Sequence, residues 1–417
     1  MIVEVLAVGT ELLLGQIVNS NAAEIGRRLA EAGLDHYRQS VVGDNLERVT
    51  AAIHEACGRS GAVIVTGGIG PTQDDITREA LCAAAGVDMV ADEEYAARLA
   101  RWWERRGREM PASNLRQAQH PRGAVLIPNA KGTAPGLRMR VGEAWVFALP
   151  GVPQEMLPML AGDVIPFLLA ESGAGETVLV SRVIRTWGES ESRVAEILDD
   201  LFTVARNPTM AFLASSGEIK VRLTARAPDR AVAGALLDPV QEEVIDRLGS
   251  RVFAVGGEPI EAMVLRLAAE RDWTIGTAES ATGGMVAARL TSVPGSSAVF
   301  AGSVVAYTAD LKVALLGVPG AVMAEHGVVS EQTALAMANG GAGRLGVDVA
   351  IAVTGSAGPD AQERPAGTMV VAVRTPEGAR AADLKMPGDR ERVRTYTTTA
   401  ALQLARLAIT GEWWGRR

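Results

Sequence analysis

The sequence predicts an α/β protein in three parts: an N-terminal parallel-sheet domain, a small α+β domain and a C-terminal α/β domain. A chain of 417 residues is longer than one hydrophobic core usually supports. Short apolar runs alternate with helical patterns before residue 170 and again after residue 256, while the rhythm between them is β-α-β-β-α-β. We therefore expect domains at residues 1–170, 171–255 and 256–417.

The first part alternates strands with helices. Ala22, Ile25 and Leu29 recur at helical spacing, as in an amphipathic helix. Strands that alternate with helices imply right-handed βαβ units and a mostly parallel sheet, which binds ligands at the carboxyl ends of its strands. The expected strands cover 3–8, 36–42, 62–66, 124–127 and 144–148, and the expected helices cover 21–32, 46–57 and 76–85.

The middle part has the order of a KH-like or ferredoxin-like layer. A KH domain that binds nucleic acid needs a GxxG clamp loop in basic surroundings. Loop 187–192 is acidic and has no such clamp, so we expect a spacer or a homodimerisation module. The expected strands cover 177–186, 210–213, 219–225 and 251–255, and the expected helices cover 190–201 and 231–248.

The third part returns to α/β alternation after the Gly256-Gly257 linker. Its pattern again favours βαβ units with a ligand site at the strand ends. The expected strands cover 273–278, 299–307, 347–354 and 368–374, and the expected helices cover 259–270, 283–291, 308–316, 330–345 and 390–409.

Composition excludes several classes of function. A net charge of -8 with 4% aromatic residues disfavours direct nucleic-acid binding. Two distant cysteines and four scattered histidines disfavour a disulfide framework, a zinc site and a Ser-His-Asp mechanism. No apolar run is long enough for a membrane helix, and the first residues read as a strand and not as a signal peptide, so we expect a cytoplasmic protein.

Glycine-rich turns follow the N-terminal strands and suggest a phosphate site. Backbone N–H groups approach phosphate oxygens closely at glycine, and a helix start favours negative charge. Acidic residues at such turns are also typical of helix N-caps, and a lone lysine is typical of a solvated loop. Carboxylates beside a phosphate cradle suggest Mg²⁺ that bridges to a pyrophosphate. The candidate phosphate ligands are Thr10, Glu11, Gly67, Gly68, Gly70, Thr72, Lys131 and Gly132, and the candidate metal ligands are Asp74 and Asp75.

A second candidate site surrounds Ser280, which lies at a strand-to-helix turn. Such a serine often caps the helix. Gly283 and Gly284 would open the backbone there for an oxyanion. A serine nucleophile needs a base, and Lys312 follows on the next helix. Lysine serves as a base only when burial lowers its pKa by several units from ~10.4, and a lysine with its tip in water would not qualify.

The N-terminal motifs at 9–15, 66–77 and 149–153 resemble those of the molybdopterin-binding-type domain, and the whole chain resembles the competence/damage-inducible CinA family. The resemblance implies that the first domain hydrolyses ADP-ribose to AMP and ribose 5-phosphate with a divalent metal. It favours Asp44 and Asp75 as metal ligands, with Asp74 beside them. Related domains bind or adenylylate molybdopterin, and that alternative stays open.

The C-terminal domain resembles the nicotinamide-nucleotide amidohydrolases, in which ESxTGG, GSS, YxxxxK and TGxAGP recur. The resemblance implies deamidation of nicotinamide mononucleotide (NMN) to nicotinate mononucleotide and ammonia, without a metal. It assigns Ser280 as nucleophile, Lys312 as base and Ser297 as a proton-relay candidate. The implied NMN-binding residues are Thr282, Gly283, Gly284, Tyr307 and Thr354, with Arg390 or Arg394 on the phosphate. The rival interpretation is a non-catalytic pterin- or nucleotide-binding protein that acts through partners.

Overall fold

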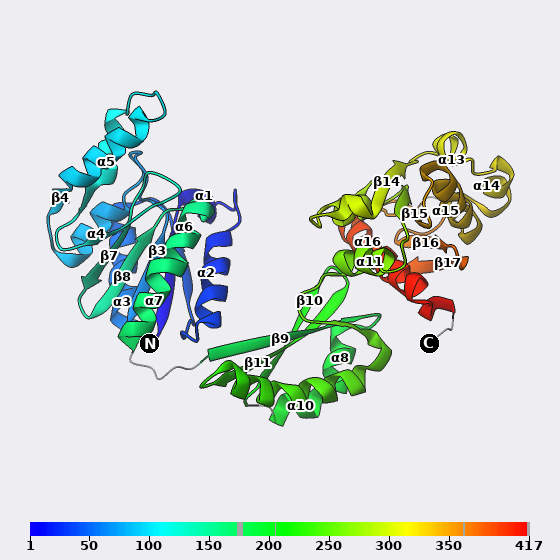
Figure 1. Cartoon of the computed structure of the whole chain (residues 1–417), viewed down its shortest axis with the longest axis horizontal. Helices are drawn as coiled ribbons and strands as arrows, with labels where there is room; N and C mark the ends of the chain where they lie inside the picture. Colours follow the sequence, from blue (N-terminus) through cyan, green and yellow to red (C-terminus); the bar gives the residue numbers. More distant parts are fainter. Residues whose placement is uncertain (173–177, 205, 362, 415–417) are drawn as a thin grey trace. The chain divides into compact units, whose positions relative to one another are not determined.

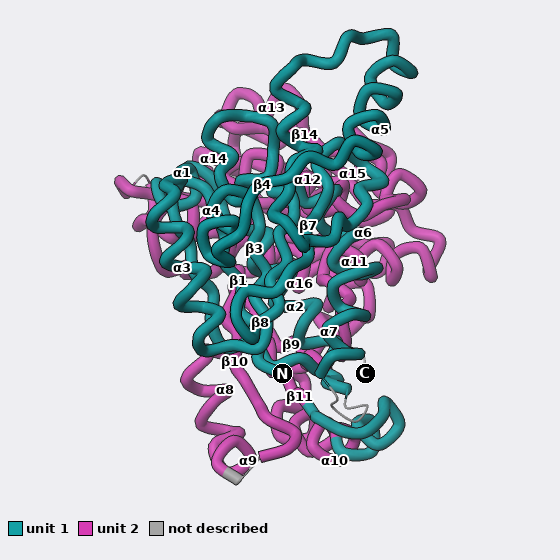
Figure 2. Tube along the Cα trace, turned by 90° about the vertical axis from the view of Figure 1, so that its left-hand side faces the viewer, with its two compact units in different colours: residues 1–180, 225–236 teal, residues 181–224, 237–417 magenta. Residues whose placement is uncertain are grey.

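The computed structural model describes residues 1–172, 178–204, 206–361 and 363–414. They form two compact units, Met1–Val180 with Ala225–Leu236, and Ser181–Thr224 with Leu237–Arg417 (Figure 2). The segment predicted as a separate middle domain is therefore divided between the two units.

The first unit contains a six-stranded sheet of order β2-β1-β3-β8-β7-β6. The first four strands run parallel, and β7 and β6 pair antiparallel at one edge. The predicted parallel sheet is thus confirmed for its core, and the antiparallel hairpin is an addition. The strands are β1 (Val3–Val8), β2 (Gln39–Val42), β3 (Ala62–Thr66), β6 (Val125–Ile127), β7 (Gly136–Val141) and β8 (Ala144–Leu149).

Helices cover both faces of this sheet (Figure 1). Alternate residues of β1 point to opposite faces: Val3 and Val5 join the core under one helix layer, and Leu6 and Val8 join the other. One layer is α3 (Leu46–Arg59) and α4 (Thr77–Ala85), and the other is α2 (Ser20–Glu31), α6 (Pro153–Met159) and α7 (Ile165–Ser172). The carboxyl ends of the parallel strands stay free for a ligand.

Helices α5 (Glu93–Glu104), α6 and α7 and strands β4 (Met89–Ala91), β5 (Gln119–Pro121) and β7 were not expected from the sequence. Helix α5 had a readable start, because the Asp92 side chain accepts a hydrogen bond from the N–H of Tyr95. Its buried side chains are few, so its apolar stripe is short.

The middle segment forms a four-stranded sheet of order β10-β11-β9-β12 with helices between the strands. This confirms the β-α-β-β-α-β order, although the expected helix at 190–201 is two short helices. Residue 177, the first of the expected strand 177–186, lies outside the described residues. The elements are β9 (Val178–Trp187), α8 (Glu191–Ile197), α9 (Asp199–Val204), β10 (Thr209–Ser215), β11 (Glu218–Ala227), α10 (Arg230–Leu248) and β12 (Val252–Val255).

The C-terminal sheet has the order β14-β13-β15-β16-β17. Strand β13 runs parallel to both neighbours, and β16 and β17 continue antiparallel from β15. Strand β17 was not expected from the sequence. The strands are β13 (Ile275–Glu279), β14 (Phe300–Val305), β15 (Val349–Ser356), β16 (Thr368–Thr375) and β17 (Gly378–Lys385).

Two apolar cores lie on the two faces of this sheet. Helices α11 (Ile260–Ala269), α12 (Met285–Thr291) and α16 (Arg390–Thr410) pack on one face, and α13 (Ala309–Leu316) and α15 (Glu331–Leu345) pack on the other. The short helix α14 (Gly320–His326), also not expected, precedes α15. The end of β13 lies at the carboxyl edge of the parallel strands, where the fold places a ligand.

Candidate functional site

Ser280 is the first residue after β13, at the carboxyl edge of the C-terminal sheet. Its N–H donates a hydrogen bond to the Val353 carbonyl of the neighbouring strand β15. The side chain is only 6% exposed. The neighbouring strand therefore fixes the backbone position of Ser280.

Lys312 lies on α13, whose start is capped by the Thr308 hydroxyl. Its Nζ is 2.9 Å from Ser280 Oγ, and the residue is 1% exposed. Two backbone carbonyls also accept from Nζ, those of Ala306 at 3.1 Å and Tyr307 at 3.4 Å. Burial lowers the pKa of Lys312 to about 8, against an opposing influence of the Glu363 carboxylate. The structure therefore brings together the predicted nucleophile and base.

A cavity of about 240 Å³ opens over this pair. Ser280, Lys312 and Thr354 are buried in its wall, whereas Tyr307, Glu363 and Arg390 are exposed. Arg390 donates to the Tyr307 hydroxyl and to the Gly358 carbonyl, both at 2.8 Å. The Thr354 hydroxyl donates to the Val328 carbonyl at 3.0 Å.

Glu363 is a cavity residue that sequence reasoning missed. It lies in the segment between β15 and β16, where no strand or helix pattern marks it. Only the fold brings it to the cavity.

The turn after Ser280 differs from expectation. The buried Glu279 carboxylate accepts the N–H groups of Gly284, Val286 and Ala287, and the Gly283 N–H donates to the Ser280 carbonyl. The amides near Gly283 that we expected to hold an oxyanion are therefore already bonded. Neither glycine lines the cavity, nor does the buried Thr282.

Ala281 lines the cavity, and its N–H has no hydrogen-bond partner within the described ranges. No other N–H of this turn meets both conditions among the described residues. Ala281 follows the serine directly, which is where hydrolases with a strand-to-helix serine often place an oxyanion donor.

The structure separates the two candidate arginines, which lie one turn apart on α16. Arg390 lines the cavity. Arg394 donates to the carbonyls of Ala281 at 3.0 Å and Thr282 at 2.8 Å, so it holds the turn. Ser297, the relay candidate, is exposed in the short helix η4 (Ser296–Ala298) and does not line the cavity.

A second cavity, of about 620 Å³, lies at the carboxyl ends of β1, β3 and β8 in the first unit. Four predicted phosphate residues and all three predicted metal ligands line it: Glu11, Gly67, Gly68, Gly70, Asp44, Asp74 and Asp75. The other four predicted residues, Thr10, Thr72, Lys131 and Gly132, do not.

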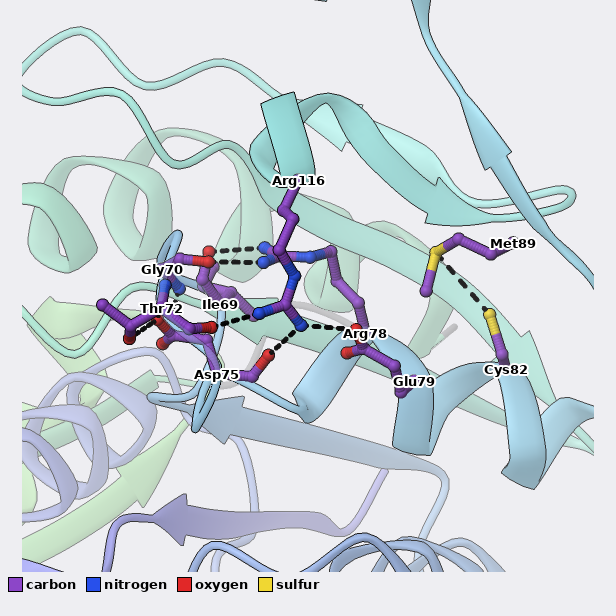
Figure 3. A network of polar contacts seen from close by, with 9 residues as sticks. All are labelled: Ile69, Gly70, Thr72, Asp75, Arg78, Glu79, Cys82, Met89 and Arg116. Atoms are coloured by element: carbon purple, nitrogen blue, oxygen red, sulfur yellow. Dashed lines mark hydrogen bonds and ion pairs between the residues drawn. The ribbon is translucent and has the colours of Figure 1, made fainter. Parts of the chain in front are cut away.

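Asp75 holds the loop that precedes α4 (Figure 3). Its carboxylate accepts the N–H of Gly70 at 2.7 Å, the N–H of Thr72 at 2.8 Å and the Thr72 hydroxyl. The buried Arg78 donates to the carbonyls of Ile69 and Gly70. The carboxylate predicted for a metal is thus also the anchor of this loop.

Arg116 braces the same loop from its other end, where it donates to the carbonyls of Thr72 and Asp75 and pairs with Glu79 at 2.6 Å (Figure 3). Sequence reasoning missed both arginines. Nothing in the motif indicates which distant residue closes the loop.

Carboxylates explain three glycines of this region. A Cβ at Gly9, Gly70 or Gly132 would lie 2.6, 2.5 or 2.2 Å from a carboxylate atom of the same cavity. Those carboxylates belong to Glu11, Asp75 and Glu155 respectively. Glu155, also missed from the sequence, accepts from the Asn129 amide at 2.6 Å.

The residues of this cavity fit a metal that is shared with a ligand. Among the described residues, no three His, Cys, Asp or Glu side chains form a group that could hold an ion alone. Mg²⁺, however, commonly takes one or two carboxylates and completes its shell with water and phosphate. Asp44 uses one oxygen to accept the Thr10 N–H at 2.8 Å, and its other oxygen has no partner in the described part of the chain.

No helix in the described part of the chain has both the length and the apolar character of a membrane span.

The domain order agrees with known families: residues 4–170 match the probable molybdopterin binding domain, 181–254 the damage-inducible protein CinA KH domain, and 257–409 the CinA C-terminal domain. The predicted fold class and the KH-like fold of the middle segment are thereby confirmed.

Relatives match along the whole chain. The CinA-like protein of Frankia casuarinae is 46% identical over 98% of this chain and 96% of its own length. A putative competence-damage inducible protein of Symbiobacterium thermophilum is 44% identical over 99% of both chains. The crystal structure of CinA from Thermoplasma acidophilum is 35% identical, covers 41% of this chain and 98% of its own, and gives a TM-score of 0.37. The chain therefore belongs to the CinA family.

Proposed function

We propose that the C-terminal domain hydrolyses the carboxamide of NMN to nicotinate mononucleotide and ammonia. The observation that carries the proposal is the 2.9 Å contact between Ser280 Oγ and a buried Lys312 Nζ. A lysine whose pKa lies near 8 is partly neutral at physiological pH, as a general base must be. The cavity is slightly smaller than the ~300 Å³ of the smallest typical ligand pockets, which suits a single ring.

The environment of Lys312 suits both of its protonation states. A neutral amine can donate its two hydrogens to the carbonyls of Ala306 and Tyr307 and direct its lone pair at Ser280. After it takes the serine proton, the ammonium has three donors for the same three acceptors. The side chain therefore does not have to move during proton transfer.

In the proposed reaction Ser280 Oγ forms a bond to the amide carbon while its proton passes to Lys312. The N–H of Ala281 donates to the oxyanion. Lys312 then protonates the amide nitrogen, the C–N bond breaks, and ammonia leaves. Water attacks the resulting ester, gives one proton to Lys312 and releases nicotinate mononucleotide, and that proton returns to Ser280 Oγ.

Arg390 supplies the phosphate contact in this proposal. It is exposed beside the cavity and already donates to Tyr307, so its position is partly fixed before a ligand binds. A guanidinium binds phosphate oxygens bidentately. Arg394 suits that role less well, because its Nε and Nη2 donate to carbonyls of the turn after Ser280.

We also propose that the N-terminal domain hydrolyses the pyrophosphate of ADP-ribose. The support is a cavity large enough for a nucleotide, lined by loop glycines and oxygen ligands at the strand ends. Asp44 and Asp74 would hold a divalent cation, which neutralises phosphate charge when bound. Asp75 would act mainly through the loop that it anchors.

An ammonia assay with NMN tests the first proposal. Ser280→Ala should lose activity, because the nucleophile is gone. Ser297→Ala is the matched control, since its hydroxyl is exposed and away from the cavity, and should keep full activity. Tight NMN binding without ammonia release by the unaltered protein would favour the rival, a non-catalytic nucleotide-binding protein.

A further inference from the structure

The amidase cavity has a charge pattern that the proposed reaction does not yet use. Its exposed lining contains one carboxylate, Glu363, and one guanidinium, Arg390. The reaction needs a nucleophile, a base and an oxyanion donor, and Arg390 accounts for the phosphate. Glu363 has no part in these steps.

Glu363 is held in place by backbone contacts. Its Oε2 accepts the N–H of Val328 at 2.6 Å and that of Val329 at 3.4 Å. Gly327 permits this approach, because a Cβ there would lie 2.9 Å from the same oxygen. Oε1 has no hydrogen-bond partner among the residues described, so it remains available to a ligand.

The proposed substrate carries a positive charge that would need a partner here. The ring nitrogen of NMN bonds to ribose and is a pyridinium cation. When the carboxamide reaches the buried Ser280, this nitrogen lies about one ring width away, toward the exposed rim. A cation that enters a confined site is costly unless an anion accompanies it.

We infer that Glu363 is a specificity-determining residue that selects a cationic pyridinium ring over a neutral ring of the same shape. The inference rests on the proposed amidase function. Glu363 and Arg390 together then match a substrate with a positive ring and a negative phosphate. Glu363, which has a free carboxylate oxygen beside the cavity, would thus act in recognition of the ring, although it takes no part in the reaction steps.

The other titratable groups near the cavity do not offer this charge. Lys312 and Arg390 are basic groups, and the Tyr307 hydroxyl accepts a hydrogen bond from Arg390. Glu279 directs its carboxylate to the start of α12. Asp310 on α13 and Glu331 on α15 are exposed and outside the cavity lining. The influence of Glu363 on the pKa of Lys312 supports its closeness to the reacting pair.

The test compares binding of two probes to the full-length protein with Ser280→Ala, which prevents turnover. The probes are the cation 1-methylnicotinamide and its neutral 1,4-dihydro form, which have nearly the same shape. At about pH 9 Lys312 is mostly neutral, so that its charge does not contribute to the difference in binding between the two probes. We expect the cation to bind about threefold more tightly, as for a partly exposed ion pair.

Glu363→Gln in the same background should abolish the preference, since the amide still accepts the Val328 N–H but has no charge. Glu363→Ala should in addition weaken both probes, because the backbone anchor is lost. An unaltered preference in Glu363→Gln, or no measurable binding of the cation, overturns the inference. A preference that depends on Glu363, together with no ammonia release from NMN by the unaltered protein, supports the inference and refutes the proposed function.

Discussion

Replacing Lys312 with methionine measures how much the burial of the Lys312 amine reduces the stability of the folded protein. The pKa of Lys312 falls from 10.5 to about 8 in the folded protein, so the unfolded chain binds more protons between these values. Stability therefore rises with pH through this window. The lowered pKa reduces the free energy of unfolding by about 3 kcal/mol at pH 7 and by about 1 kcal/mol at pH 9.5. Methionine has a similar length and no proton to bind.

The difference in stability between the two proteins should therefore change by about 2 kcal/mol between these pH values, with the lysine protein gaining. Methionine also removes the hydrogen bonds to Ala306 and Tyr307, but that loss does not depend on pH and cancels in the comparison. Hydrogen exchange of amides in β13 and β15 measures opening of this sheet alone in the full-length chain.

The same pKa predicts the activity profile. Ammonia release from NMN should rise with pH and level off above about 8, with about one tenth of the plateau rate at pH 7.

A difference in stability between the lysine and methionine proteins that is equal at both pH values would refute the reasoning, because it would show that Lys312 keeps an ordinary pKa and is almost fully protonated at neutral pH.

Three further outcomes follow from the contacts. Arg390→Ala should raise the KM for NMN about tenfold with little change in kcat, whereas Arg394→Ala should lower kcat and stability because the turn after Ser280 loses its support. A chelator should abolish hydrolysis of ADP-ribose, followed as release of AMP, and spare ammonia release from NMN. Asp75→Ala should destabilise the first unit by about 1 kcal/mol in urea unfolding, since it removes the hydrogen bonds from the N–H groups of Gly70 and Thr72.

The sequence motifs and the periodicity of apolar residues made much of the architecture predictable. Val3, Val5, Leu6 and Val8 alternate between two cores, and such a strand is visible in the sequence. The missed elements have weaker signals. Strand β17 has no fully buried residue and lacks an apolar run. Helix α5 has an aspartate cap and a short apolar stripe that could have been recognised.

Prediction of the site failed where a role depends on the direction of a side chain. Arg390 and Arg394 share one helix and one chemistry, but Arg394 donates to the carbonyls of Ala281 and Thr282, whereas Arg390 lines the cavity. The sequence likewise indicates that α12 has unpaired N–H groups at its start, but the Glu279 carboxylate occupies them. Long-range contacts of this kind have no local pattern.

The two cavities face opposite electrostatic problems, and this explains why one proposed reaction needs a cation and the other does not. The N-terminal cavity is lined by five carboxylates, and several of them lie directly against the loop glycines that would receive a phosphate. A diphosphate would be repelled there unless a divalent ion lay between the charges. The C-terminal cavity instead buries a lone amine with neutral partners, so it functions only when that amine loses its proton. We therefore expect a metal to control the first proposed reaction and pH the second, and a chelator titration and a pH titration on the same chain should separate the two activities completely.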